Sequence, residues 1–292
     1  MRELTTRPAR REDLAAVADL QRRWDVAYFG SAENDEDEVN ESFSRAEPLA
    51  ERSLLVHDGD RLVGAAYIWS DEAVVLVDPA VEAEPVLAEL LGWCTAQPEL
   101  AQIEALDRDH PMLAALAEHG WTHVRSAFDL IRDVTPDWQL AEPEWPPGVE
   151  VRSLRDDDAE ALYELIYNDA GWAEIAGHNN RAFADWRGIF LSPEHPPEQQ
   201  VLVTREGALI GAALGRIFSD GAGWVAQLAV AKSARRQGLG RALLLESYRR
   251  HLAAGATKLG LSVQAGNRTA LDLYLGIGLT IDREWLIYRR DA

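Results

Sequence analysis

The composition of the chain is that of a globular protein. It has 292 residues, of which 47% are apolar and 27% are charged, close to the averages of folded soluble domains. No apolar run approaches the roughly 20 residues that span a bilayer, and the N-terminal stretch MRELTTRPARREDL lacks the apolar core of a signal peptide. We therefore expect a cytoplasmic protein without a membrane partner.

The net charge of −20 is confined to the first half of the chain. Residues 1–150 carry 32 acidic and 12 basic side chains, whereas residues 151–292 carry 17 of each. Such acidity disfavours nucleic acid as a partner and makes the first half a poor place to bind a polyphosphate. The acidic cluster ENDEDEVNE, residues 33–41, is typical of a solvated loop or a helix start.

The single cysteine, Cys94, excludes an internal disulfide and a cysteine-based metal cluster. It lies in the apolar run VLAELLGWC, which indicates a small buried side chain rather than a nucleophile. We expect no bound metal.

The two halves of the chain repeat one plan. RPARREDLAAVADLQ resembles RSLRDDDAEALYELI, and LLVHDGDRLVGAAYIW resembles VLVTREGALIGAALGR. AVVLVDP likewise corresponds to VAQLAVA, and MLAALAEHGW to ALDLYLGIGL. The matched segments keep their order along the chain, which favours an internal duplication over two unrelated modules.

The residue pattern of each repeat predicts, in this order, a helix, a hairpin of two strands, a central strand, a helix, a strand, a helix and a final strand. This alternation is typical of an α/β fold around a mixed sheet. The proline-rich stretch between the repeats, residues 135–148, is typical of an extended linker. We therefore expect two tandem domains, residues 1–134 and residues 149–292.

A glycine-bearing basic turn follows the central strand of the second repeat. The apolar run WVAQLAV predicts a buried strand, and the stretch RRQGLGR, residues 235–241, precedes a segment with a helical apolar stripe. A helix N-terminus presents unpaired N–H groups and a positive dipole end, so it can hold an anion. The turn matches neither a dinucleotide fingerprint nor a phosphate-binding P-loop. By itself it is either an anion site or a simple helix start.

The first repeat lacks this turn. After AVVLVDP it continues AVEAEPVLAELL, so Glu82 and Glu84 stand where the second repeat has arginines and glycines. Carboxylates there would repel an anionic ligand. The first repeat therefore keeps the fold pattern and has lost the anion site.

The segment KLGLSVQAGNRTALDLYLGIGL predicts a strand followed by a helix. Asn267 is well placed to cap that helix, and the spacing of its apolar positions puts Tyr274 on the buried face. A core aromatic is the simplest interpretation of Tyr274. In the first repeat Leu116 occupies the equivalent position, so the volume is retained there without the hydroxyl.

The second repeat resembles the GNAT superfamily of acyl-CoA-dependent N-acyltransferases. The family signature Arg/Gln-x-x-Gly-x-Gly/Ala matches Arg235, Gly238 and Gly240. A second signature, Asn-x-x-Ala-x-x-Leu-Tyr-x-x-x-Gly-Phe, matches from Asn267 to Gly278, with leucine in place of the final phenylalanine. Two signatures in the right order are far more specific than either alone, and the whole chain resembles a tandem GNAT arrangement with a degenerate first copy.

The resemblance implies a role for each matched segment. It implies acetyl-CoA as co-substrate, with pantetheine amides paired to the backbone at the end of the central strand and the pyrophosphate held by the turn. Tyr274 would give a proton or a hydrogen bond to the departing thiolate, and Asn267 would contact the cofactor or only cap its helix. The implied cofactor-binding residues are Leu228, Ala229, Val230, Arg235, Arg236, Gln237, Gly238, Leu239, Gly240, Arg241 and Asn267.

No general base is evident in the places where it would be expected. Many relatives carry a glutamate on the strand before the asparagine, but this chain has Ser262 there, and the central strand has no carboxylate. The remaining candidates are Asp169, Glu174 and His178, in a segment that binds the acceptor in relatives. His178 has the most suitable ordinary pKa, although a surface histidine in a loop is commoner.

We expect an N-acetyltransferase that moves the acetyl group of acetyl-CoA to a primary amine by direct attack in a ternary complex. The acceptor would be a small molecule or a peptide, and the acidic first half would favour a cationic one. Two alternatives stay open at this point: an acyl-CoA sensor without turnover, motivated by the missing base, and an interaction module in which the glycine turn is only structural.

Overall fold

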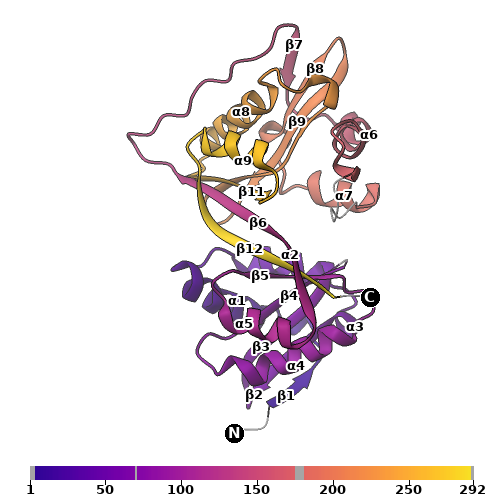
Figure 1. Ribbon diagram of the computed structural model, residues 1–292, viewed down its shortest axis with the longest axis vertical. Coiled ribbons are helices and arrows are strands. Elements are labelled where there is room, and N and C mark those ends of the chain that lie inside the picture. The colour runs from indigo at the N-terminus through magenta and orange to yellow at the C-terminus, as the bar shows by residue number, and fades with distance from the viewer. Residues whose placement is uncertain (1–3, 70, 175–180, 291–292) are drawn as a thin grey trace. The chain divides into compact units, whose positions relative to one another are not determined.

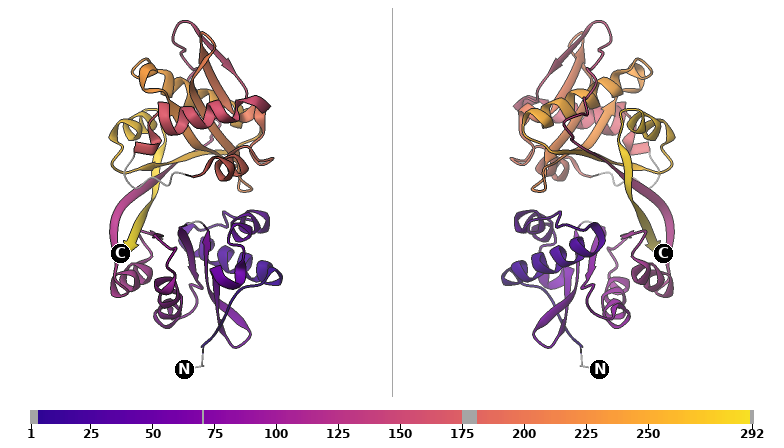
Figure 2. Two further views of the ribbon diagram at one scale, coloured as in Figure 1. Left: turned by 90° about the vertical axis from the view of Figure 1, so that its right-hand side faces the viewer. Right: turned by 90° about the vertical axis from the view of Figure 1, so that its left-hand side faces the viewer.

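The chain folds into two compact units, each of which packs helices on a mixed sheet (Figures 1 and 2). The computed structural model describes residues 4–69, 71–174 and 181–290. The first unit comprises residues 1–128, 264–266 and 283–292, and the second comprises residues 129–263 and 267–282. The predicted α/β fold on a mixed sheet is confirmed.

The first unit orders its strands β1-β2-β3-β4-β5-β12, and only β4 and β5 run parallel among the neighbours whose register is defined. Its elements are β1 (Leu4–Arg7), α1 (Leu14–Phe29), α2 (Glu36–Arg45), α3 (Leu49–Arg52), β2 (Ser53–Asp58), β3 (Arg61–Trp69), β4 (Glu72–Val77), α4 (Ala83–Ala96), β5 (Gln102–Leu106) and α5 (His110–Glu118).

The second unit orders its strands β6-β11-β10-β9-β8-β7, and β10 runs parallel to β11. Its elements are β7 (Val149–Arg152), α6 (Ala159–Glu164), a π-helical turn (Leu165–Asp169), α7 (Phe183–Phe190), β8 (Val201–Arg205), β9 (Ala208–Ile217), β10 (Ala222–Val230), α8 (Leu239–Ala253), β11 (Lys258–Gln264) and α9 (Arg268–Leu275).

Two long strands contribute to both units. β6 (Trp121–Asp133) ends the first repeat, yet its residues from Asp129 onward belong to the second unit; β12 (Thr280–Arg290) ends the second repeat, yet its residues from Arg283 onward belong to the first unit. The compact units therefore do not follow the sequence ranges 1–134 and 149–292, which describe the repeats. No helix or strand lies in residues 134–148, where the sequence predicts a linker.

Each repeat opens with a short strand that the sequence pattern did not predict. β1 and β7 are edge strands of four residues, LTTR and VEVR, and none of their side chains is fully buried. Each ends in an arginine that pairs with an aspartate six residues on, Arg7 with Asp13 and Arg152 with Asp158, through two hydrogen bonds of 2.5 to 2.7 Å. The bond from Arg7 holds the pKa of the Asp13 carboxyl below its usual range. Identical pairs at matched positions support the duplication.

The acidic cluster starts a helix, as one of the two interpretations predicted. Asp35 is the N-cap of α2, and its side chain accepts a hydrogen bond from the Glu38 amide at 2.9 Å. The Glu38 side chain in turn accepts a hydrogen bond from the Asp35 amide at 3.1 Å, which completes a capping box.

Cys94 is buried in the core of the first unit, and burial raises the pKa of its thiol to about 12. A thiol with that pKa is no nucleophile, as expected.

Helix α8 packs closely on the sheet of the second unit because two strand glycines make room for it. A Cβ on Gly215 would lie 2.9 Å from the His251 ring, and a Cβ on Gly223 would lie 2.7 Å from the His251 Cβ. α8 contacts β8, β9 and β10, and the π-helical turn contacts β9 and β10.

Along residues 4–69, 71–174 and 181–290, no helix combines the length and the apolar character needed to cross a bilayer.

Candidate active site

The central strand of the second unit parts from its parallel neighbour halfway along. β10 pairs with β11 from Ala222 to Val225, opposite Lys258 to Leu261, while its pairing with β9 continues to Val230. The ladder between β10 and β9 shifts between Val225 and Gln227, which marks a bulge. The backbone of residues 226–230 therefore faces an opening toward β11, called here the fork. Leu228, Ala229 and Val230, predicted to pair with pantetheine amides, lie on it.

The predicted anion turn lies directly after the fork. A short 3₁₀ turn (Lys232–Ala234) leads into residues 235–238, which are exposed, and α8 begins at Leu239. Gly238 is the N-cap with φ +81°, and no side chain caps the helix. The first-turn amides of α8, from Leu239 to Arg241, are thus available to an anion.

Several contacts hold the turn in place. Arg235 donates to the backbone carbonyls of Ala170 at 2.6 Å and Val230 at 3.3 Å, so its guanidinium ties the turn to its surroundings. The Gln237 side chain accepts from Arg205 at 2.9 Å. Arg236 has φ +61°, a left-handed conformation that is strained for a residue with a Cβ. Such strain is typical of turns with a functional constraint.

The predicted general acid lies on a short helix beyond β11. Asn267 caps α9, accepting from the Ala270 amide at 3.3 Å, so the capping role is confirmed. Tyr274 is buried, with 7% of its surface exposed, and burial raises its pKa to about 12. The nearby phenol of Tyr248 is fully buried, and its pKa is raised by burial and by the charge that Tyr274 would carry if ionised. Tyr274 therefore stays protonated at neutral pH, and its hydroxyl can donate a hydrogen bond.

The structure describes two of the three predicted base candidates, Glu174 and Asp169. Both carboxylate oxygens of Glu174 accept from the Lys232 ammonium at 2.7 Å. Asp169 lines a cavity of about 390 Å³, together with Asn168 and residues 208–210 and 231–233. His178 lies outside the described residues.

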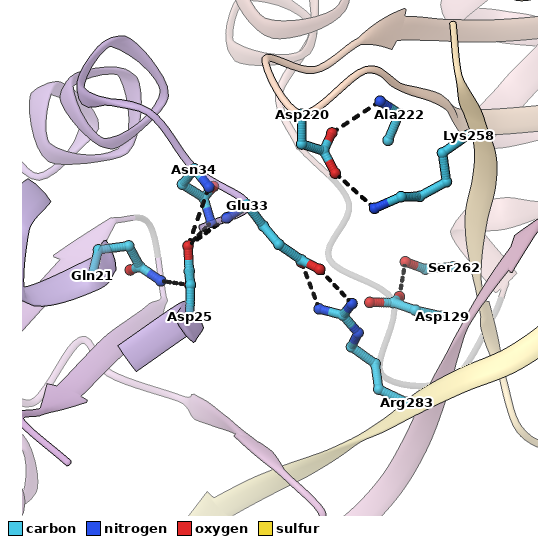
Figure 3. Close-up of polar contacts among 10 residues, drawn as sticks. All are labelled: Gln21, Asp25, Glu33, Asn34, Asp129, Asp220, Ala222, Lys258, Ser262 and Arg283. Carbon is cyan, nitrogen blue, oxygen red and sulfur yellow. Dashed lines mark hydrogen bonds and ion pairs between the residues drawn. The ribbon is translucent and has the colours of Figure 1, made fainter. Parts of the chain in front are cut away.

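Sequence reasoning missed one carboxylate that the structure brings to β11. Asp129 of β6 is buried, and its Oδ1 accepts a hydrogen bond from the Ser262 hydroxyl at 2.5 Å (Figure 3). The two residues are 133 positions apart, so no local pattern joins them. The one available signal is an acidic residue within the otherwise apolar stretch AFDLI.

The first unit keeps the strand arrangement and lacks the anion turn. β4 and β5 pair over only two residues, from Glu72 to Ala73 on β4. After β4, the buried Asp78 accepts hydrogen bonds from Arg23 at 3.1 Å and Arg61 at 2.5 Å. Both arginines are therefore ion-paired with an internal carboxylate, and the loss of the anion site inferred from Glu82 and Glu84 stays a prediction.

Comparisons with known proteins agree with this geometry. Residues 150–278 match the model of the acetyltransferase (GNAT) family. A mycothiol acetyltransferase of Thermobispora bispora is 27% identical over 83% of this chain and 85% of its own length, and one of a Nocardioides species is 26% identical over 91% and 93%. Among solved structures, a GCN5-related N-acetyltransferase from Sphaerobacter thermophilus has a TM-score of 0.80 at 23% identity, covering 98% of this chain and 95% of its own.

The tandem arrangement also has a solved counterpart. A tandem GNAT protein from the clavulanic acid biosynthesis pathway has a TM-score of 0.75 at 16% identity, covering 98% of both chains. The resemblance inferred from the two signatures, to tandem GNAT proteins of the mycothiol synthase type, is therefore confirmed. Residues 150–278 therefore carry an acyltransferase domain of the GNAT type, and the whole chain has the fold of tandem GNAT proteins.

Proposed function

We propose that the second unit binds acetyl-CoA and transfers its acetyl group to a primary amine by direct attack in a ternary complex. The observation that carries the proposal is the fork of β10 and β11 followed directly by the uncapped N-terminus of α8. Open backbone groups on a strand suit the amides of pantetheine, since a buried unpaired amide needs a partner. The exposed amides of the turn, with the positive end of the helix dipole, suit the pyrophosphate.

Tyr274 contributes a hydrogen bond rather than a free proton in this proposal. Its pKa of about 12 exceeds the roughly 8.5 of an ordinary thiol, so complete proton transfer to the departing thiolate is unfavourable at equilibrium. A phenol that stays protonated in a dry site still stabilises the negative charge that develops on sulfur. The proton of the thiol then comes through Tyr274 or from solvent.

The acceptor belongs to the class of small-molecule amines that the curated relatives indicate by their names. We propose that the amine substrate of the mycothiol acetyltransferases is the first acceptor to test. The acidity of the first repeat favours a cationic acceptor, so polyamines, aminoglycosides and basic peptide N-termini complete the panel.

Two measurements test the proposal. Calorimetry with acetyl-CoA reports binding, and a colorimetric thiol assay reports acetyl transfer to an acceptor panel grouped by charge. We expect binding heat in the absence of an amine and thiol release with at least one amine. Absence of binding heat would overturn the proposal in favour of an interaction module. Binding without thiol release for any amine would favour a sensor, the alternative suggested by the lack of a carboxylate on β10 and β11 at the fork.

A further inference from the structure

A carboxylate borders the fork although neither fork strand supplies one. The last paired residues of the two strands are Val225 on β10 and Leu261 on β11, and Ser262 follows directly, where the strands separate. Its hydroxyl donates to Asp129, which is 9% exposed. The side chain of Asp129 thus lies beside the beginning of the opening (Figure 3).

Asp129 lies on the face of the sheet away from α8. A Cβ on Gly260 would lie 2.4 Å from the Trp224 ring, whereas a Cβ on Gly223, the residue before Trp224, would meet His251 of α8. Trp224 and Gly260 therefore face away from α8. Side chains alternate along a strand, so Ser262 shares the face of Gly260.

The proposed transfer requires a proton acceptor. As the amine nitrogen bonds to the thioester carbonyl carbon, the carbon–sulfur bond breaks and its electron pair leaves on sulfur. The nitrogen must then lose a proton, which a positioned carboxylate can accept directly or through one water. The fork strands offer Trp224 and Ser262 near their point of separation, and neither side chain is a base at neutral pH.

We propose that Asp129 is the general base of the second unit. This inference rests on the proposed function. The carboxylate accepts the proton of the attacking amine, and Ser262 orients it through the hydrogen bond to Oδ1. The proton returns to solvent after the acetylated amine leaves. The base of the second repeat is then supplied by the last strand of the first.

The test compares three variants of the full chain with the wild type, using acetyl-CoA and the best amine of the panel. Asp129→Asn keeps the shape of the side chain and the acceptor oxygen for Ser262, but removes the base. We expect kcat to fall by about 100-fold or more, as for other general bases, with the Kd for acetyl-CoA unchanged within twofold by calorimetry. Ser262→Ala keeps the carboxylate and should lose about tenfold or less. Asp133→Asn, an exposed carboxylate on the same strand, should equal the wild type.

The pattern of losses separates the possible outcomes. An Asp129→Asn variant that keeps more than a third of wild-type kcat would overturn the inference and leave the proposed function intact. Equal losses in Asp129→Asn and Ser262→Ala, or weakened acetyl-CoA binding in Asp129→Asn, would assign Asp129 a structural role and also overturn it. A wild type that binds acetyl-CoA without turnover would overturn both proposals.

Discussion

Acid should destabilise the second unit through one buried histidine. His251 lies on α8, the helix whose first turn forms the proposed pyrophosphate site, and it is fully buried against Gly215 and Gly223. Burial lowers the pKa of its imidazole from 6.5 to about 4. Between these values the unfolded chain binds a proton that the folded protein excludes, so the free energy of unfolding decreases as the pH falls.

The magnitude follows from the width of that interval. Each unit of pKa difference is worth about 1.4 kcal/mol, so the free energy of unfolding should drop by about 3 kcal/mol between pH 6.5 and pH 4 from this group alone. Well above pH 6.5 the imidazole is neutral in both states and contributes no pH dependence. Other groups titrate over the same range, so the effect of His251 has to be measured as a difference.

Urea unfolding of wild type and His251→Gln at pH 7.0 and pH 4.5 measures this difference. Glutamine cannot titrate, so the stability of the variant relative to wild type should improve by about 2 kcal/mol between pH 7.0 and pH 4.5. His110→Gln, which replaces an exposed histidine, serves as the matched control and should track the wild type. Parallel pH profiles for wild type and His251→Gln would refute the reasoning.

Substitutions at three further positions test the site and its support. Gly240→Glu should abolish acetyl-CoA binding in calorimetry, while Gly240→Gln should retain it. A Cβ at this position would make only ordinary contacts at 3.8 and 4.0 Å, so the two variants differ mainly in the added negative charge. Equal losses of binding would point to a steric effect. Tyr274→Phe should slow kcat by about tenfold or more and leave the Kd for acetyl-CoA within twofold; a matching loss of binding would make Tyr274 only a core residue. Gly260→Ala should lower the free energy of unfolding by roughly 1–3 kcal/mol, since its Cβ would lie 2.4 Å from the Trp224 ring and 3.1 Å from the Leu130 carbonyl; unchanged urea unfolding would contradict this packing.

Local signals in the sequence were sufficient to predict the local structure of the candidate site. The glycine turn, the cap at Asn267 and the buried position of Tyr274 each depend on residues within one turn or one helix, so spacing alone predicts them. The fork follows from the family resemblance, and its geometry appears in the register of β10 and β11. The physical reason for success is the same in each case, because neighbouring residues determine the conformation.

The features that the sequence did not predict leave only a short local pattern of residues, or none. β1 and β7 are edge strands of only four residues, LTTR and VEVR, so each offers at most two apolar positions. The contact of Asp129 with Ser262 joins different repeats, so it depends on strand order rather than on spacing. The comparison of the two repeats could not predict that β6 and β12 each contribute to both units. It assigns each of these last strands to its own copy.

This division of the last strands has a consequence for how the two copies evolve. A chain cut at the linker would leave the second copy without residues 129–133, the part of β6 that belongs to its compact unit. The first copy would lose residues 283–292 in the same cut. Neither copy can then be deleted without damage to the other, so selection for acetyl transfer also preserves the fold of a copy that has no anion turn. The framework of the first copy is therefore preserved whether or not that copy binds a ligand.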